Sequence, residues 1–350
     1  MNPTKNIKLM MIGYLPPPIG GVTVLFKQLV DDIYSMDNID IIVVDLATEN
    51  KQLINKLSIL YKSLSKIVTN LKDIDIITFH AVTGSTIILG PIIYVLAKIF
   101  RKKIIIREFG GVFHKKYKKF SFFTKFILKN TIFKSDIFLF ETKEQVHFFN
   151  TLCKRTEWYP NSRKLGLNNQ EIHPSAEKFV FISQMKKSKG VQEIFYASKD
   201  LPKQISIDLY GPLNYDISKK DIDELNSKYP AKYFKSLNPS EVSQILTNYD
   251  VVLLPTYHYG EGYPGIILEA YIYGLPVITT KWNAIPEIVD NTSGILIEPK
   301  NSNQLKNAIL KLYHDKEYYI RLQKGAQKKA IEFSSQVWSE KFIDYCKELL

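Results

Sequence analysis

The sequence predicts an α/β protein built from two doubly wound domains, each with a parallel sheet. Short runs of branched apolar residues alternate with helical patterns along most of the 350 residues. Runs that are apolar throughout are typical of parallel strands covered on both faces. The alternation stops at Arg155–Gly166 and then restarts, which divides the chain into two halves. A chain of this length suits two domains of ordinary size.

The N-terminal half contains five predicted strands separated by helical patterns. A loop with three prolines and two glycines follows the first strand and precedes a helix over Val22–Tyr34. The uncharged stretch Ala81–Ala97 is at the lower limit of a membrane span, so we expect a buried helix instead. The strands are predicted at Ile7–Tyr14, Ile39–Asp45, Ile74–His80, Lys103–Arg107 and Asp136–Phe140.

The C-terminal half repeats the alternation and ends in a long helical tail, Asn301–Leu350. Glycine-rich turns follow several of its apolar runs, as expected at strand ends. Its strands are predicted at Lys178–Ser183, Ile205–Tyr210, Asp250–Leu254, Pro276–Thr279 and Gly294–Ile297.

Composition favours a protein of a reducing compartment. The two cysteines, Cys153 and Cys346, have no metal-ligand spacing and cannot form a disulfide framework. The apolar run Leu9–Leu15 is short and ends in prolines, so we expect no secretory signal and a cytoplasmic location.

The net charge of +12 is concentrated in one region. Twelve Lys or Arg and one acid, Glu108, lie between Lys98 and Lys134, with phenylalanines among them. We predict that Lys115–Lys129 forms one amphipathic helix on an anionic bilayer. The alternatives are a solvated basic face over a core helix and a nucleic-acid surface, although no nucleic-acid-binding motif accompanies the charge.

The segment Gly260–Pro276 carries the most specific pattern. Glu261 lies in a glycine-rich loop after an apolar run, and Glu269 lies in an apolar helical stretch. Ligands of parallel α/β sheets bind outside the carboxyl ends of strands, often with phosphate at a helix N-terminus. Carboxylates accept hydrogen bonds from sugar hydroxyls. The pattern therefore predicts a nucleotide-sugar site.

This segment resembles the E-x7-E signature of retaining glycosyltransferases of family 4, with Leu268-Glu269-Ala270 and Gly274-Leu275-Pro276-Val277 after it. The resemblance implies the GT-B fold, in which two Rossmann-like domains with doubly wound parallel sheets face each other across a cleft. Residues 1–160 would form the acceptor domain and residues 165–332 the nucleotide-sugar donor domain. A C-terminal helix, 333–350, would pack back onto the first domain.

The resemblance also implies the donor site. Glu261 would bind the donor sugar, Glu269 the ribose, and Lys189 the diphosphate, with Glu261 and Lys189 also catalytic. Gln184 stands where the family carries arginine, and it offers neutral donors in place of a charged fork. The full set of donor-binding candidates is Gly20, Gly21, Gln184, Lys189, Gly211, Glu261, Gly262, Tyr263, Pro264, Gly265, Ile266 and Glu269.

The acceptor side is implied by a loop after the fourth strand. His114 ends a glycine-rich turn and is the first candidate for a catalytic histidine near the sugar; otherwise it is a basic-surface histidine. His80 and His258 are the next candidates. Arg107 would neutralise a phosphate or pair with Glu108. The acceptor-side candidates are thus His80, Arg107, Gly110 and Gly111.

Together these features imply transfer of a sugar, with retention, from a UDP-sugar to a glycan or lipid-linked acceptor. GDP is the second choice of nucleotide. The expected setting is cell-surface polysaccharide synthesis, such as capsule or lipopolysaccharide, at the inner face of the membrane. No cofactor beyond the nucleotide-sugar, no metal and no nucleic acid are expected. The D-x-D matches at Asp73–Asp75 and Asp221–Asp223 are attributed to chance.

Two other functions stay open at this point. Gly260–Gly265 fits the G-x-G-x-x-G pattern of a nicotinamide-dependent oxidoreductase, but five residues intervene after the strand and no ribose-binding acid follows the next one. The other is a protein that has a transferase fold, no longer catalyses transfer, and binds a membrane or a polysaccharide. Gln184 favours that possibility, whereas Lys189, Glu261 and Glu269 oppose it.

Overall fold

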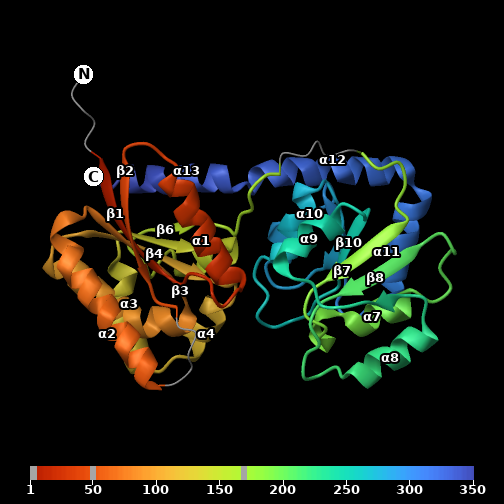
Figure 1. The fold of residues 1–350 in the computed structure, drawn as a ribbon, viewed down its shortest axis with the longest axis horizontal. Coiled ribbons are helices and arrows are strands. Elements are labelled where there is room, and N and C mark those ends of the chain that lie inside the picture. Colours follow the sequence, from red (N-terminus) through yellow and green to blue (C-terminus); the bar gives the residue numbers. More distant parts are fainter. Residues whose placement is uncertain (1–5, 48–52, 167–171) are drawn as a thin grey trace. The chain divides into compact units, whose positions relative to one another are not determined.

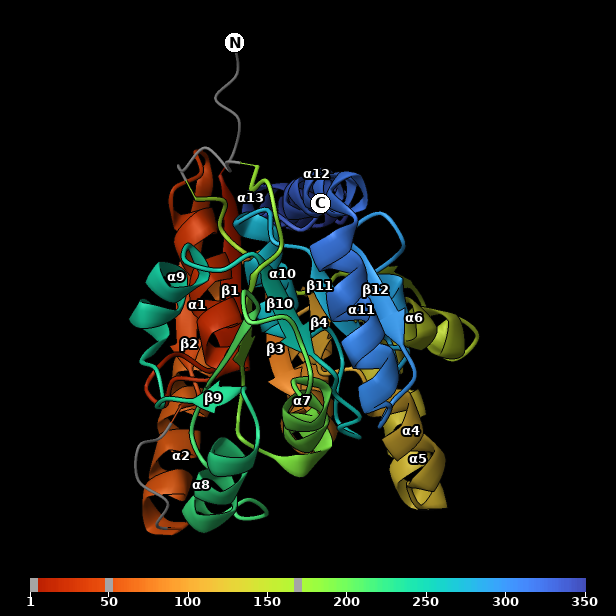
Figure 2. The ribbon, with the colours of Figure 1, turned by 90° about the vertical axis from the view of Figure 1, so that its right-hand side faces the viewer.

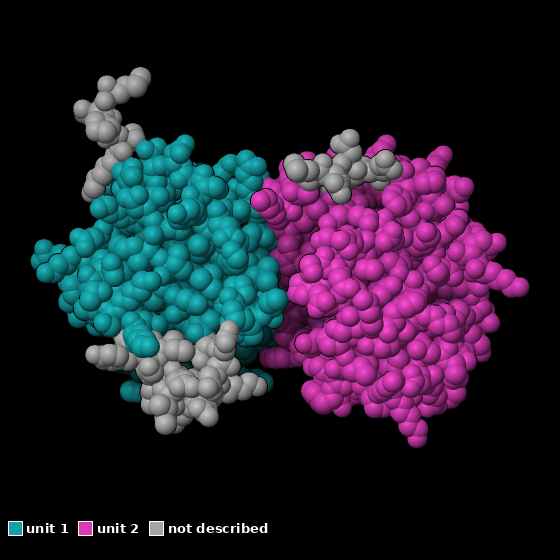
Figure 3. All heavy atoms as spheres, viewed as in Figure 1, with its two compact units in different colours: residues 1–162, 335–350 teal, residues 163–334 magenta. Residues whose placement is uncertain are grey.

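A computed structural model describes residues 6–47, 53–166 and 172–350, with the side chains of 53–61 excepted. The chain forms two compact units, residues 1–162 with 335–350 and residues 163–334 (Figure 3). Within the described residues, each unit contains a six-stranded sheet in which neighbouring strands are parallel. The predicted doubly wound α/β architecture is confirmed for both halves.

In unit 1 the sheet has the order β2-β1-β3-β4-β5-β6 (Figure 1). Its inner strands are almost entirely buried because helices cover both faces. The strands are β1 (Ile7–Gly13), β2 (Ile39–Asp45), β3 (Ile76–Val82), β4 (Lys103–Phe109), β5 (Ile137–Phe140) and β6 (Thr156–Trp158).

The helices of unit 1 form two layers. One face of the sheet packs against α1 and α13, which share a core with Leu9, Ile105 and Leu139. The opposite face packs against the helices between β2 and β6, around Phe79 and Phe138. The helices are α1 (Gly21–Tyr34), α2 (Leu53–Asn70), α3 (Thr83–Ile99), α4 (Phe113–Lys119), α5 (Phe122–Asn130), α6 (Lys143–Phe149) and α13 (Ser335–Lys347), with 3-10 turns η1 (Leu71–Asp73) and η2 (Ile132–Lys134).

The tail helix α13 completes the core of unit 1. Trp338, Phe342 and Tyr345 are buried in the same cluster as α1 and the central strands. The Tyr159 hydroxyl donates to the carbonyl of Trp338 at 2.9 Å. Residues 335–350 therefore belong structurally to the first unit.

Three predictions for unit 1 need correction. Thr156–Trp158 is the edge strand β6, not linker; it is short and half-buried, so it lacks an apolar run. The basic segment is two helices, α4 and α5, separated at Phe120 and Ser121 (Figure 2). Ser121 begins the second helix by accepting a hydrogen bond from the Thr124 amide at 3.1 Å.

The third correction concerns α3, which is buried on only one side. Ile93 is 2% exposed, whereas Ile88 is 65% exposed on the opposite side of the helix. A helix that is apolar all round shows no polar stripe from which the solvent side could be assigned. No helix within the described residues is long and apolar enough to cross a membrane.

In unit 2 the sheet has the order β12-β11-β10-β7-β8-β9. Its central strands are apolar and buried, as their sequences predict. The two-residue edge strand β9 was not predicted, because a bridge so short has no periodicity. The strands are β7 (Lys178–Ile182), β8 (Ser206–Tyr210), β9 (Lys232–Tyr233), β10 (Val251–Leu254), β11 (Val277–Thr280) and β12 (Gly294–Ile297).

The helices of unit 2 pack in pairs, α7 with α11 and α10 with α12. Gly325 in α12 lets that helix approach the loop before β12, because a Cβ there would lie 1.8 Å from the Thr292 carbonyl oxygen. The helices are α7 (Val191–Ala197), α8 (Lys219–Lys228), α9 (Pro239–Leu246), α10 (Gly265–Ile272), α11 (Ser302–His314) and α12 (Lys316–Glu332), with 3-10 turns η3 (Lys187–Lys189) and η4 (Ile285–Glu287).

Candidate functional site

The candidate site lies in unit 2, at the carboxyl ends of β7, β10 and β11. The loop after β7 leads into η3, and the loop after β10 leads into α10. Pro264, the N-cap of α10, provides no side-chain hydrogen bond to the first turn of the helix. The exposed amides of such a turn favour an anion. Three loops and one helix N-terminus therefore meet where this fold class binds ligands.

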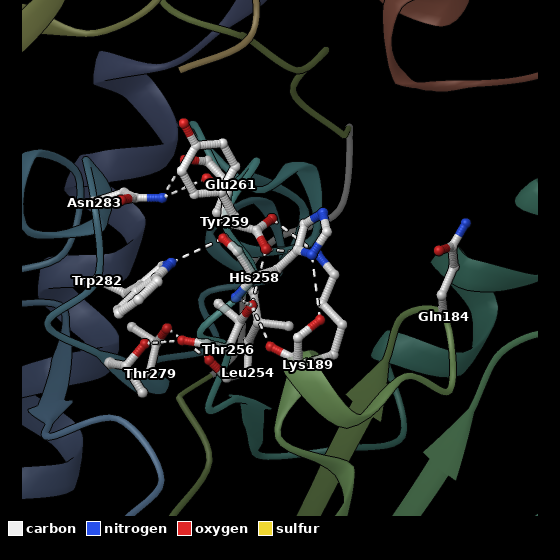
Figure 4. Close-up of polar contacts among 12 residues, drawn as sticks. Gln184, Lys189, Leu254, Thr256, His258, Tyr259, Glu261, Thr279, Trp282 and Asn283 are labelled. Atoms are coloured by element: carbon white, nitrogen blue, oxygen red, sulfur yellow. Dashed lines mark hydrogen bonds and ion pairs between the residues drawn. The ribbon is translucent and has the colours of Figure 1, made fainter. Parts of the chain in front are cut away.

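The centre of the site is an ion pair between Lys189 and Glu261 (Figure 4). Lys189 Nζ lies 2.9 Å from Glu261 Oε1 and 2.6 Å from Oε2. Both side chains are largely buried, at 14% and 8% exposed. An ammonium and a carboxylate attract each other more strongly at this depth than in water, so each restricts the position of the other in the free protein.

Hydroxyl groups from the adjoining loops orient this pair. Thr256 Oγ1 donates to Glu261 Oε2 at 2.9 Å. Ser188 Oγ lies 3.2 Å from Nδ1 of His258, so His258 also belongs to the site. Burial and the neighbouring ammonium of Lys189 lower the pKa of His258, which favours its neutral form.

The loop that carries Glu261 is held in place from β11. Trp282 Nε1 donates to the carbonyl of His258 at 2.8 Å. Asn283 Nδ2 donates to the carbonyls of Tyr259 and Glu261 at 3.1 and 3.2 Å. Asn283 does this from a left-handed backbone conformation, with φ of 47°. The carboxylate of Glu261 is therefore positioned by a rigid neighbouring loop.

Gly190 allows η3 to lie against the β10 loop. Its φ is +80°, and a Cβ there would lie 2.3 Å from the carbonyl oxygen of Pro255. Gly211 plays the same part after β8, where its φ is +146° and a Cβ would lie 1.7 Å from the Ser183 carbonyl oxygen. Both positions require glycine, since side chains are strained there and would clash with backbone.

Glu269 lies in α10, one turn beyond the glycine-rich loop. Its Oε1 accepts a hydrogen bond from Arg163 Nε at 2.9 Å. Arg163 also lies against the start of the helix, because a Cβ on Gly265 would be 2.1 Å from its Nη2. A cation is unfavourable at a helix N-terminus unless an anion accompanies it, and Glu269 supplies one.

The rest of the predicted loop leads into α10. Gly262, Tyr263 and Pro264 are buried, and the Tyr263 hydroxyl donates to Glu287 Oε2. Gly265 and Ile266 form the first turn of the helix and are partly exposed. The backbone of this turn is therefore the part that a ligand could reach.

Gln184 stands apart from the central ion pair. It is exposed on the loop after β7, and its Oε1 accepts a hydrogen bond from Asn214 Nδ2 at 3.3 Å. Figure 4 shows its side chain separated from the cluster around Lys189. The cations closest to Gln184 in sequence are Lys186, over the Tyr215 ring, and the exposed Lys187.

The predicted residues of unit 1 divide into exposed and buried groups. Gly20 and Gly21 are exposed at the start of α1, and a Cβ on either would meet no atom within 4 Å. His80 is fully buried between the rings of Phe26 and Phe342, so it is part of the core and not of an accessible surface. Burial holds the pKa of His80 well below its usual value.

Arg107 is also a core residue. It is 3% exposed, and its guanidinium stacks 4.3 Å from the Phe109 ring centroid and 4.4 Å from that of Tyr159. Its Nη2 donates to the carbonyl of Pro160 at 3.3 Å. The expected pairing with Glu108 is not found, because adjacent strand residues point to opposite faces. A phosphate-binding role for this arginine stays a prediction.

His114 is buried and is not a surface residue. It is 2% exposed, and its Nε2 lies 3.1 Å from Oε1 of Glu144 in α6. Burial lowers its pKa, and Glu144 partly opposes this effect. The loop before it is held through Gly110, whose amide donates to Glu141 Oε2 at 2.8 Å, and Gly111 is buried. A catalytic role for His114 stays a prediction.

Both D-x-D sequences have structural roles. Asp75 Oδ2 accepts a hydrogen bond from the Lys8 amide at 3.0 Å. Asp221 completes a capping box with Ser218 at the start of α8. In the part of the chain that the structure describes, no three His, Cys, Asp or Glu are grouped to hold a metal ion.

Sequence reasoning missed several residues that shape the site. Arg163 lies in Arg155–Gly166, the stretch that divides the two halves of the sequence, and this position is a signal that could have been used. Thr256 lies between a buried strand and Glu261, the usual place for a ligand-orienting side chain. Trp282 and Asn283 gave no signal, because only the folded chain brings them beside the Glu261 loop.

Comparison with known protein families now bears on this site. Residues 167–329 match the family model described as glycosyl transferases group 1. The matched segment covers most of unit 2. Lys189, Glu261 and Glu269 all lie within it.

Curated proteins that are similar to this chain include several sugar transferases. The chain is 27% identical to the sulfoquinovosyl transferase SQD2 of Arabidopsis thaliana over 119 residues, which are 33% of this chain and 23% of that protein. It is 27% identical to the D-inositol 3-phosphate glycosyltransferase of Corynebacterium jeikeium over 128 residues, 36% of this chain and 30% of that protein. These alignments span less than a third of either relative's own length.

Solved structures share the fold of almost the whole chain. HepE of Anabaena in complex with UDP aligns with a TM-score of 0.74 and 15% identity, over 98% of this chain and 100% of that one. The sucrose-phosphate synthase of Thermosynechococcus elongatus aligns with a TM-score of 0.74 and 14% identity, over 98% of this chain and 99% of that one. The two units therefore have the GT-B fold, as the sequence predicted.

Proposed function

We propose that this protein is a retaining glycosyltransferase that transfers a sugar from a UDP-sugar to a glycan or lipid-linked acceptor. The observation that carries the proposal is the ion pair of Lys189 and Glu261 beside the uncapped start of α10. It provides a cation and helix amides for a diphosphate, and a carboxylate for sugar hydroxyls. These are the groups that a nucleotide-sugar requires.

Donor binding on this proposal exchanges one set of partners for another. Lys189 turns from Glu261 to the diphosphate, and Glu261 then accepts hydrogen bonds from the sugar. Glu269 accepts hydrogen bonds from the ribose hydroxyls, and Arg163 holds its carboxylate in place. Because the free protein already holds these groups in position, little order has to be created when the donor binds.

The reaction breaks the bond between the anomeric carbon and the diphosphate oxygen, and forms a bond from that carbon to the acceptor oxygen. The acceptor hydroxyl gives its proton to an oxygen of the departing diphosphate. Lys189 and the first amides of α10 stabilise the negative charge that develops on that leaving group. No side chain has to act as a nucleophile, and none is proposed for the role.

Solved relatives support UDP as the nucleotide. HepE of Anabaena has been solved with UDP, with UDP and glucose, and with UDP-glucose. Among further structural relatives is a lipopolysaccharide outer core galactosyltransferase. We extend these features to this chain as a proposal, with cell-surface polysaccharide synthesis at the inner face of the membrane as its setting.

A thermal-unfolding assay with UDP, GDP, CMP, ADP and NAD tests the donor site. We expect UDP to raise the melting temperature of the wild type, since a ligand at a hundred times its dissociation constant stabilises by about 2.7 kcal/mol. Glu269→Gln should lose most of this shift, because the amide is a weaker acceptor for the ribose hydroxyls. Glu298→Gln, which alters a surface ion pair with Lys281, is the matched control and should keep it.

The results also separate the remaining alternatives. A shift with NAD and none with a nucleoside diphosphate would overturn the proposal in favour of an oxidoreductase. That outcome conflicts with the ligand loop, because residues 255–264 separate β10 from α10 where a dinucleotide motif needs a tight turn. No shift with any nucleotide would favour the non-catalytic protein, for which the exposed Gln184 is the motivating observation.

A further inference from the structure

A row of aliphatic side chains is uncovered along the outer side of α3. Ile88, Ile92, Val95 and Ile99 are exposed, and Ile99 is 67% exposed. Spacings of four, three and four residues place them on one side of the helix, over about 16 Å at 1.5 Å per residue. The opposite side, with Ile93, packs into the core. We call these four residues the aliphatic stripe.

The neighbouring helix α5 exposes three aromatic rings. Phe122, Phe123 and Phe126 are 85%, 69% and 55% exposed. Lys129 is exposed one turn beyond Phe126, on the same side of the helix. Leu128, on the inner side, is fully buried. We call the three phenylalanines the aromatic cluster.

The aliphatic stripe and the aromatic cluster belong to one surface of unit 1. Helices α3 and α5 contact each other. Both bury their inner sides in the same core cluster, so their outer sides face away from the same face of the sheet. Gly90 permits the close packing, because a Cβ there would lie 2.9 Å from Ile132 in the turn that follows α5.

The segment that contains α4 and α5 carries charge of one sign. Residues 109–135 contain seven lysines and no acidic residue. Lys116, Lys118, Lys119 and Lys129 are exposed, whereas the preceding acid, Glu108, is fully buried. A surface that joins exposed apolar side chains to unopposed lysines complements an anionic, apolar partner.

We propose that the aliphatic stripe and the aromatic cluster form a docking face for an anionic phospholipid bilayer. The phenylalanines and isoleucines would enter the interfacial region, and the surrounding lysines would bind phosphate headgroups. A nucleic acid fits less well, because aliphatic side chains gain nothing from a phosphate backbone. The inference deepens the proposed function and rests on it in one respect, since a lipid-linked acceptor would bring the enzyme to a bilayer.

Flotation of the full-length protein with lipid vesicles tests this proposal. We expect binding to phosphatidylcholine vesicles that contain a quarter phosphatidylglycerol, and little binding to phosphatidylcholine alone, because each lysine near an anionic surface contributes about fivefold. The triple variant Phe122→Ser, Phe123→Ser, Phe126→Ser should reduce the bound fraction about tenfold or more.

Ile88→Gln with Val95→Gln should also reduce the bound fraction, because the proposal includes α3. The Lys119→Gln, Lys129→Gln variant should bind less, and its binding should depend less steeply on salt, because part of the positive charge is removed.

Matched controls lie on the other face of the same unit. Tyr34, 79% exposed in α1, is changed to Ser, and Lys27, which pairs with Asp31 in α1, is changed to Gln. Both variants should bind vesicles as the wild type does. Brominated lipid should quench the fluorescence of the tryptophan introduced by Phe123→Trp, whereas it should not quench that of the tryptophan introduced by Tyr34→Trp. All variants should keep the wild-type shift with UDP, so failure of membrane binding is distinguishable from failure of the donor site.

Three results would overturn the proposal. The first is equal binding to vesicles with and without phosphatidylglycerol. The second is binding that the changes in α3 and α5 leave unaltered. The third is that the wild type binds no vesicles and self-associates in solution, while the triple phenylalanine variant is monomeric. The surface would then be an interface between copies of this chain.

Discussion

Replacing Lys189 by methionine is expected to reduce turnover about 10²- to 10³-fold, the loss typical of removing one preorganised donor to a developing negative charge. Methionine keeps much of the length of the side chain and removes its charge. The assay is release of UDP from UDP-glucose, UDP-galactose and UDP-N-acetylglucosamine, which requires no knowledge of the acceptor. We expect kcat to fall more than KM rises, because the charge on the leaving group is greatest in the transition state.

The same substitution leaves Glu261 buried without its cation, which alone would destabilise the protein by about 3 kcal/mol or more. The double variant Lys189→Met, Glu261→Gln separates the two effects. It removes the uncompensated carboxylate, so we expect stability to recover while turnover stays low. Lys228→Met, in an exposed ion pair of α8, is the surface control and should alter neither. Wild-type turnover in a stable Lys189→Met protein would contradict the proposed role.

The second large effect concerns stability, through the buried carboxyl group of Glu108. It is fully buried and accepts hydrogen bonds from the hydroxyls of Thr83, at 2.7 Å, and Thr86. Burial raises its pKa from 4.5 to about 8, although the two threonines act in the opposite direction. At neutral pH the folded protein therefore holds this carboxyl group in its protonated form.

The sign of the pH dependence follows from this shift. Between pH 4.5 and about 8 the folded state keeps a proton that the unfolded chain has lost. The free energy of unfolding therefore falls as the pH rises through this window, by about 1.4 kcal/mol per pH unit at most. Above the folded-state pKa the loss is complete, and below pH 4.5 it is absent.

Glu108→Gln removes the titration. We expect its stability to match the wild type near pH 5 and to exceed it by about 3 to 5 kcal/mol at pH 8, measured by denaturant unfolding at each pH. Glu340→Gln changes an exposed carboxylate of α13 in the same unit and should follow the wild-type curve. A Glu108→Gln curve parallel to the wild type would show that Glu108 is ionised in the folded protein.

Much of the fold could be predicted because local sequence patterns indicate most of the strands and helices. The apolar runs at Ile104–Ile106 and Val251–Leu254 form buried central strands. Helices cover both faces of such strands, so their side chains are apolar throughout. The edge strands β6 and β9 were missed for the converse reason. They are short and partly exposed, so neither burial nor periodicity marks them in the sequence.

Prediction of the site was uneven for a related reason. Lys189 and Glu261 lie in motifs that surround them with glycine, and the structure brings them together. The histidines carried no such context. His80 and His114 were expected at or after strand ends, where ligand-binding residues lie. The structure places His80 within β3 and His114 within α4, and their rings are packed against Phe342 and Phe148. Whether a polar side chain at a strand end faces solvent or core depends on residues distant in sequence, which no local pattern contains.

The return of α13 to the first unit has a consequence for the order in which the protein is made. Unit 2 is one continuous segment, whereas unit 1 combines residues 1–162 with 335–350. Trp338, Phe342 and Cys346 fill the core between α1 and the first sheet, so that core stays open until residues 335–350 have been synthesised. The half that is synthesised first is therefore finished last. Until then its apolar side is accessible to chaperones and to other nascent chains.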